Sequence, residues 1–186
     1  MGMPAAQLWT ADDVRALPDD GQRYEVIDGV LYLSPSPRAP HQRAIPELLL
    51  LLGPFVRAQR IGELLLSPSD IEFDPRTMVQ PDVFVMPLVQ GRRQREFNEA
   101  RGLVLAIEIL SPSTARRDRT VKKDLFMREG VPDYWIVNLK ARAIEWWRPG
   151  FERPRVEMQS LSWHPAGATE SLSIDVAAFF AAVLDD

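Results

Sequence analysis

The sequence predicts one domain of the α/β (α+β) class, in which a mixed β-sheet is flanked by helices. Its 186 residues are the length of one domain, since domains usually contain roughly 100–200 residues. Strand and helix patterns follow one another along the chain, which is typical of helices packed on a sheet. Residues Leu103–Leu110 are almost all apolar, as expected of a central strand covered on both faces. No linker-like segment divides the chain, so we expect a single domain over residues 1–186.

The first third of the chain contains patterns for a short helix, a hairpin and a long helix. Thr10–Asp13 has the spacing of a capping box, which starts a helix. Asp28-Gly29 interrupts the apolar segment Tyr24–Leu33, and this dipeptide favours a tight β-hairpin. A leucine-rich helix is expected over about His41–Arg60, and Pro46 must lie in its first turn or kink it.

Further strands are expected on both sides of a polar loop at Asp74–Thr77. The two flanking segments, Leu64–Phe73 and Val79–Met86, are rich in apolar residues. The segment Gln90–Arg101 is polar and charged, and we expect it to be mobile. The apolar run Leu103–Leu110 then supplies the central strand.

The second half of the chain predicts a helix, three strands and a closing helix. Gly130 is well placed to end the first of these helices, because glycine readily adopts the left-handed conformation there. The expected elements are a helix over Arg116–Glu129, strands over Asp133–Asn138, Ala143–Arg148 and Val156–Leu161, and a helix over Ile174–Leu184 with Asp175 near its start.

The triplet Ser-Pro-Ser begins at Ser34, Ser67 and Ser111, each time after an apolar segment. The three copies have no common flanks or fixed period, so they are not a structural repeat. The simpler interpretation is that each proline ends a strand, because proline cannot donate a ladder hydrogen bond.

The composition narrows the chemistry that the chain can perform. The sequence has no cysteine and only two histidines, His41 and His164. Disulfides, thiol nucleophiles, cysteine-ligated zinc and iron–sulfur clusters are therefore excluded, as is a site with many histidines. A metal would be held by carboxylates and carbonyls, which favours a hard cation such as Mg²⁺.

The whole-chain charge is mildly acidic, at −4, with a sequence pI of about 5.3. This balance argues against a protein that coats nucleic acid indiscriminately. The longest apolar run, Leu48–Val56, is far shorter than the ~20 residues that a membrane helix needs, and the first nine residues do not have the pattern of a signal peptide. We therefore expect a cytoplasmic protein with no membrane association.

Two carboxylates lie in segments that are expected to be buried. Glu108 interrupts the apolar run, and Asp82 follows Pro81 at the start of another apolar segment. Either one alone is most simply an exposed residue at a strand end. Together, with a nearby backbone carbonyl, they would supply the oxygen ligands that Mg²⁺ prefers.

Other polar residues have both a structural and a functional interpretation. Lys122 or Lys123 could offset charge on a phosphate, or could belong to a solvated helix face. Glu25 on the first hairpin could be a surface residue, and His41 could cap its helix, contact a phosphate or be exposed.

An ordered series of short motifs resembles a known family. It comprises Tyr24-Glu25-x-Ile27-Asp28-Gly29, Ser34-Pro-Ser-Pro37 with His41-Gln42, Ser67-Pro68, Gln80-Pro81-Asp82-Val83, Glu108-Ile-Leu-Ser-Pro-Ser-Thr114, Asp118 with Lys122, and Gly130-Val-Pro-Asp-Tyr-Trp-Ile-Val137. Over about Tyr24–Arg148 the chain closely resembles the Uma-two family of restriction endonucleases, within the PD-(D/E)XK nuclease superfamily. The resemblance implies a restriction-endonuclease-like core and a metal-dependent endonuclease acting on DNA.

The resemblance also implies the site residues. Asp82 matches the aspartate of the PD element and Glu108 matches the second acid, while Leu110 stands where the superfamily has its lysine. The resemblance assigns the lysine to the following helix at Lys122, and Glu25 becomes an additional catalytic acid at the metal site, which would bind the metal directly or through water. Asp82, Glu108 and the backbone carbonyl of Ile109 would then bind Mg²⁺ or Mn²⁺.

The acidic total conceals a basic segment around this site. Residues 91–128 contain ten basic and five acidic side chains, a net charge of +5, which leaves −9 for the rest of the chain. Such a segment suits contact with the phosphate backbone of DNA, although a solvated loop and helix is an equally good interpretation. The residues expected to bind substrate are His41, Gln80, Arg116, Arg117 and Arg119.

Two other classes of function compete with an endonuclease. A catalytically silent nuclease fold could bind DNA or a protein, although the presence of Asp82, Glu108 and Lys122 disfavours it. A structural or assembly protein could use its tryptophans at an interface. Because Trp146 and Trp147 are adjacent in a strand, they point to opposite faces, which motivates the prediction of a homodimer.

Overall fold

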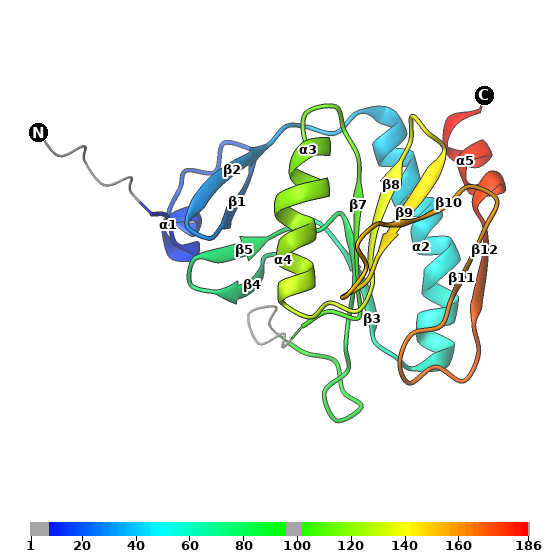
Figure 1. Ribbon diagram of the computed structural model, residues 1–186. Helices are drawn as coiled ribbons and strands as arrows, with labels where there is room; N and C mark the ends of the chain where they lie inside the picture. The colour runs from blue at the N-terminus through cyan, green and yellow to red at the C-terminus, as the bar shows by residue number, and fades with distance from the viewer. Residues whose placement is uncertain (1–7, 96–101, 186) are drawn as a thin grey trace, which may run out of the picture.

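The computed structural model describes residues 8–95 and 102–185 and has helices on both sides of a central mixed sheet (Figure 1). The strand order in this sheet is β10-β9-β8-β7-β6-β3. The β7–β8 pair is parallel, and the other neighbouring pairs are antiparallel. The strands are β3 (Glu63–Leu66), β6 (Val83–Met86), β7 (Leu105–Ile109), β8 (Tyr134–Asn138), β9 (Ala143–Trp147) and β10 (Arg155–Glu157).

Strand β7 is the central strand that the apolar run predicts. All five of its residues are buried, including Glu108. Alternate residues of the sheet face two different cores. Residues such as Ile107 and Trp135 pack against α2 (Ala39–Gln59) and α5 (Val176–Leu184). On the opposite face, residues such as Ala106 pack against the helical segment that ends in α4 (Lys123–Arg128) and against a second sheet.

The second sheet has the order β2-β1-β5-β4. Its hairpin is the one predicted at Asp28-Gly29, where both residues have positive φ, 50° and 78°. The predicted capping box at Thr10 is also confirmed, and it starts a short helix that packs against β1. The elements of this region are α1 (Ala11–Arg15), β1 (Arg23–Ile27), β2 (Val30–Ser34), β4 (Ile71–Asp74) and β5 (Thr77–Val79).

Two of the predicted strands are wrong in extent, because each is two strands. The segment Leu64–Phe73 divides into β3 and β4, and the segment Val79–Met86 divides into β5 and β6. In each pair one strand belongs to the central sheet and the other to the second sheet. The interruptions fall at Pro68 and Pro81, whose nitrogens cannot donate ladder hydrogen bonds. The chain therefore crosses twice between the sheets, and the second crossing leads directly into Asp82.

The end of the chain differs from the prediction in the same way. The segment Val156–Leu161 is split between β10 and β11 (Ser160–Trp163), and β11 pairs with β12 (Leu172–Asp175). Ile174 therefore lies in a strand and not in the closing helix. Asp175 caps that helix, because its side chain accepts the backbone N–H of Ala178 at 2.8 Å.

Helix α2 begins two residues earlier than predicted and contains both Pro46 and Pro54 in its interior. Pro46 is therefore not in the first turn, and each proline removes one backbone hydrogen bond. The helix is fixed by its buried stripe, since its buried residues recur every three or four positions. They are His41, Ala44, Leu48, Leu52 and Val56. His41 therefore enters the interior because it continues the apolar stripe by one turn.

The predicted helix over Arg116–Glu129 is three consecutive helical segments. α3 (Ala115–Arg117) is followed by the π-helical segment η2 (Asp118–Lys122) and by α4. Gly130 has a φ of 71° and follows the C-cap residue Glu129, so it ends the helix as predicted. The π-helical turn was not predicted, and it carries Asp118 and Lys122, both of which are buried.

The adjacent tryptophans of β9 face opposite sides of the sheet, as predicted. Trp146 is buried, and Trp147 is half-buried with the ammonium of Lys123 5.4 Å from its ring centre. Neither is an exposed ring, so these residues do not strengthen the expectation of a homodimer. The expected mobile segment lies partly outside the described residues, at 96–101. Within the described ranges, no helix combines the length and apolarity needed to cross a membrane.

Candidate active site

Asp82 and Glu108 are cross-strand neighbours at the edge where β6 begins and β7 ends. Val83 pairs with Ile107 in this antiparallel ladder, so one further step places Asp82 opposite Glu108. The side chains of both residues are almost completely buried, with relative exposures of 3% and 5%. The structure therefore brings the two predicted acids together under the hairpin β1–β2.

Asp82 is held by three donors from different elements. Its Oδ2 accepts the backbone N–H of Ile109 at 2.8 Å and lies 3.0 Å from Nε2 of His41. Arg23 approaches Oδ1 at 3.4 Å. Burial raises the pKa of Asp82, but the hydrogen bonds with His41 and Ile109 and the charge of Arg23 together hold it below its ordinary value. Asp82 is therefore ionised and fixed in orientation.

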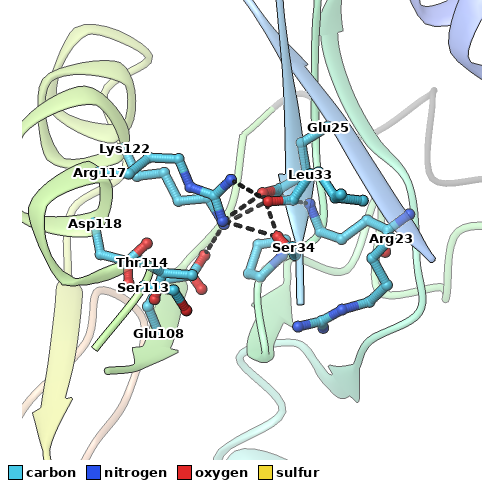
Figure 2. Close-up of polar contacts among 12 residues, drawn as sticks. Arg23, Glu25, Leu33, Ser34, Glu108, Ser113, Thr114, Arg117, Asp118 and Lys122 are labelled. Carbon is cyan, nitrogen blue, oxygen red and sulfur yellow. Dashed lines mark hydrogen bonds and ion pairs between the residues drawn. The ribbon is translucent and has the colours of Figure 1, made fainter. Parts of the chain in front are cut away.

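Lys122 lies between two buried glutamates. Its Nζ is 2.7 Å from Oε1 of Glu108 and 2.8 Å from Oε1 of Glu25. Glu25 also accepts the backbone N–H of Gln80 at 2.7 Å. Figure 2 shows this arrangement, with Lys122 and Arg117 reaching from the helical segment toward Glu25 on the hairpin. Lys122 thus joins the second sheet to the central sheet through a pair of ion pairs.

The pKa values of these groups are shifted by one another and by burial. Burial works against the charge of Lys122, but Glu108, Glu25 and Asp118 raise its pKa above the ordinary value. Glu25 has a lowered pKa because Lys122 and Arg117 outweigh its burial. The pKa of Glu108 is well above its ordinary value, since its burial and the neighbouring acids outweigh the attraction of Lys122.

Asp118 is a further acid at this site. It is buried on the π-helical segment, four residues before Lys122, and its Oδ1 has no hydrogen-bond partner. Its pKa is raised, chiefly by burial. The sequence indicated Asp118 only as part of the spacing that selects Lys122, so its position at the site was not predicted. Four buried acids thus lie at this site, with Lys122, Arg117 and Arg23 as their cationic partners.

A cleft of about 590 Å³ opens over these residues. The loop at Ser34–Arg38 and the loop at Ser111–Thr114 both line it, and we call these loops its walls. Two of the three Ser-Pro-Ser triplets therefore line one cleft. The third supports its floor, because the hydroxyl of Ser67 donates to the backbone carbonyl of Pro81 at 2.7 Å.

The residues expected to bind substrate have different positions. His41 and Gln80 line the cleft, and so does Arg117, which donates to the hydroxyl of Ser34 at 2.8 Å. Arg116 is exposed and does not line the cleft. Arg119 also lies outside it, because its guanidinium forms an ion pair with Glu145. The structure therefore brings three of the five predicted residues to the cleft and leaves Arg116 and Arg119 away from it.

Sequence reasoning missed Arg23, which lines the cleft and contacts Asp82. The signal was available, because Arg23 lies two residues before Glu25 in a strand. Residues at this spacing point to the same face.

The donor groups fit a hard divalent cation at Asp82 and Glu108. The described residues contain no group of three or more His, Asp and Glu side chains placed to bind a metal ion. Mg²⁺, however, is usually bound by one or two carboxylates, with waters and substrate phosphates as its other ligands. Two adjacent carboxylates that line one cleft match that pattern. The contact described for Ile109 is its N–H to Asp82, and no contact shows its predicted role as a carbonyl ligand.

Comparison with known proteins bears on what such a site does. The model of the Uma2 family, described as "Putative restriction endonuclease", matches residues 11–179. The chain belongs to the Uma2 family. The motifs predicted this family from residues 24–148. The family model matches a longer region, which includes all of those residues.

A solved structure supports the fold of the Uma2 chain. The crystal structure of "a putative nuclease belonging to DUF820" from Anabaena variabilis is similar to it with a TM-score of 0.77 and 24% sequence identity. The similarity covers 94% of the Uma2 chain and 99% of the other chain. No curated protein matches the Uma2 chain significantly. The predicted restriction-endonuclease-like architecture, a mixed sheet flanked by helices, is therefore confirmed.

Proposed function

We propose that this Uma2 protein is a metal-dependent endonuclease that hydrolyses phosphodiester bonds of DNA. The observation that carries the proposal is the convergence of Asp82, Glu108 and Lys122 on one buried edge of the sheet, with Lys122 Nζ 2.7 Å from Glu108. This is a PD-(D/E)XK-like site in which the lysine comes from the helical segment after the second acid. Membership of a family described as restriction endonucleases supports DNA as the substrate.

Asp82 and Glu108 would hold Mg²⁺ (or Mn²⁺), with the backbone carbonyl of Ile109 as an additional ligand and Glu25 nearby. When bound, such a cation supplies Lewis-acid chemistry, because it activates water and polarises the phosphoryl oxygen. His41 and the N–H of Ile109 hold Asp82 in one orientation. Loss of a group that orients a metal ligand in this way typically costs about 10- to 100-fold in metal affinity or activity.

Lys122 would place its positive charge beside the phosphate, where negative charge develops in the transition state. A fixed cation in a buried site stabilises such charge far more than an exposed one does. Glu108 and Glu25 lie 2.7 and 2.8 Å from the ammonium of Lys122 and raise its pKa. The reaction itself adds one water across a P–O bond, so that one product ends in a phosphate and the other in a hydroxyl. Arg117 and Gln80 would contact the DNA backbone next to the scissile bond.

Incubation of the purified protein with DNA and Mg²⁺, Mn²⁺ or chelator tests the proposal. Cleavage of plasmid or oligonucleotide DNA should need the metal and should disappear in Asp82→Ala, Glu108→Ala and Lys122→Ala. The matched control is Lys123→Ala, which removes the neighbouring lysine outside the cleft and should leave cleavage intact. Cleavage that survives all three site substitutions would reject this site.

A second candidate is a catalytically silent nuclease fold that binds DNA or a protein. One observation favours it: Lys122 pairs with both Glu25 and Glu108, so part of the negative charge that would attract a metal is already offset within the protein. DNA binding without cleavage under any metal would establish this alternative. The proposals of a homodimer and of a cytoplasmic location do not depend on the site. A single monomeric species in light scattering would reject the homodimer.

A further inference from the structure

The walls of the cleft differ in chemistry from its floor. The floor carries the buried acids and Lys122, whereas the wall loops alternate prolines with serine, threonine and arginine side chains. The prolines are Pro35, Pro37 and Pro112, and Leu139 and Leu184 line the cleft where they pack against the edge of the core. A surface that contacts only the sugar–phosphate backbone of a duplex would be expected to be polar and positively charged. Prolines in the walls indicate that the bases also contact the protein.

The cations of the cleft fall into two groups. Arg23 and Arg117 are engaged with the buried acids Asp82 and Glu25. Arg38 and Lys140 also line the cleft, but both are exposed, and neither forms an ion pair within the described residues. They belong to different elements, since Arg38 precedes α2 and Lys140 follows β8. These two cations are therefore available to phosphates at the rim.

The size and depth of the cleft restrict what can enter it. Its volume of about 590 Å³ is within the range of pockets that enclose one small molecule, about 300–1,000 Å³. The candidate metal ligands lie at its bottom, where Asp82 and Glu108 are at most 5% exposed. A phosphate oxygen must come to about 2 Å from a Mg²⁺ ion that these carboxylates hold. A duplex keeps its bases stacked and paired between its two backbones, whereas a single strand can present a phosphate to the acids and its base faces to the prolines of the same cleft.

We propose that this cleft takes single-stranded or locally unpaired DNA. Unstacked bases would lie against the prolines of the walls and the two leucines of the cleft, and Arg38 and Lys140 would hold the phosphates that flank the scissile bond. Binding of this kind uses base surfaces and backbone charge together and does not depend on sequence. The inference rests on the proposed function, because it takes DNA as the substrate class.

Fluorescence anisotropy in the presence of chelator tests the inference without cleavage. The probes are one labelled oligonucleotide as a single strand and the same oligonucleotide annealed to its complement. We expect the single strand to bind more tightly than the duplex.

The variant R38A/K140A removes the two rim cations. Each lost phosphate contact with a single strand lowers the salt slope of log K by about 0.7, which corresponds to roughly fivefold in affinity at 0.1 M salt. The double variant should therefore bind about 25-fold more weakly than the wild type. Neither side chain caps or pairs with another element, so folding should be preserved. The charge-matched control is R76A/R153A, which removes two exposed arginines outside the cleft and should bind as the wild type does.

Three results would overturn the inference: duplex binding as tight as single-strand binding, wild-type affinity in R38A/K140A, or no binding of either probe. The cleavage assay separates this inference from the proposed function. Metal-dependent cleavage of duplex without a single-strand preference would reject the inference and leave the nuclease function standing. A single-strand preference that depends on the rim cations, but without cleavage, would support the inference and reject the nuclease function.

Discussion

His41 Nε2 lies 3.0 Å from Oδ2 of Asp82, and the two residues are 41 positions apart in the sequence. The contact is buried, and the other ring nitrogen, Nδ1, has no hydrogen-bond partner. His41 therefore has one polar contact in the described structure, and that contact fixes a candidate metal ligand.

His41→Ala should lower the cleavage rate about 10- to 100-fold, the usual cost of losing a group that orients a metal ligand. The loss should be accompanied by weaker Mg²⁺ binding, measured by titration calorimetry with the metal alone. His164→Ala removes the other histidine, which is exposed and bonds only to Ser171 among the contacts described for its side chain. That control should behave as the wild type does. Unchanged metal affinity in His41→Ala would show that His41 does not position Asp82.

Lys122→Met should destabilise the fold by about 3–5 kcal/mol at neutral pH, because it leaves Glu25, whose pKa Lys122 lowers, buried without this cation. The measurement is urea unfolding in chelator. The matched control, Lys123→Met, changes the next residue, whose ion pair is with an exposed aspartate, and should cost no more than about 1 kcal/mol. Equal losses in the two variants would contradict the role of Lys122 as the buried counter-ion.

Glu108→Gln should abolish cleavage and at the same time stabilise the metal-free protein. The pKa of Glu108 is raised in the fold, so ionisation of this residue favours the unfolded chain. The stability of the wild type therefore falls as the pH rises from the pKa of Glu108 in the unfolded chain, about 4.3, toward its raised pKa in the folded protein. The Gln variant has no ionisable group at this position and does not lose this stability. We expect a gain of about 0.5–2 kcal/mol at neutral pH that vanishes below pH ~4. Thermal unfolding across pH measures it, with the exposed Glu170→Gln as the control; a gain that persists at low pH would exclude this cause.

Asp133→Asn should destabilise the protein by about 1–3 kcal/mol, because buried donors lose a charged acceptor. Asp133 accepts the indole N–H groups of Trp146 at 2.7 Å and Trp163 at 2.9 Å, as well as the guanidinium of Arg148. Urea unfolding and tryptophan fluorescence would report the change. The exposed Asp19→Asn serves as the control and should stay within about 0.5 kcal/mol of the wild type. DNA cleavage should be retained in both, since neither residue lines the cleft.

Much of the fold could be predicted because its signals are local. The Asp28-Gly29 turn, the capping box at Thr10 and the apolar run that becomes β7 each depend on a few adjacent residues. The boundaries that were wrong depend on distant partners. Nothing within residues 64–73 reveals that β3 and β4 belong to different sheets, since that is decided by which strands they pair with.

The acidic residues of the site could be predicted from the sequence more readily than its lysine and arginines. Asp82 and Glu108 stood out because a carboxylate in an apolar strand is costly unless it is paired. The choice of Lys122 over Lys123 came from the family motif, because both have the same local surroundings in the sequence. Arg117 and Arg119 are two residues apart, so they point to opposite sides of the helical segment, and the packing of a segment that includes a π-helical turn decides which side faces the acids. No sequence period gives the direction of such a turn.

The π-helical turn at Asp118–Lys122 changes the direction in which side chains point before and after it along one helical segment. In a regular α-helix each residue advances the direction of the side chains by about 100°, and a π-turn absorbs one extra residue at constant direction. Asp118 and Lys122 point to the acids, whereas Leu125 and Phe126 point to the core. Deletion of one residue from this turn would restore a uniform helix, but the ammonium and the two apolar side chains could then no longer be satisfied together. The site therefore requires a particular number of residues in the turn as well as a lysine at position 122.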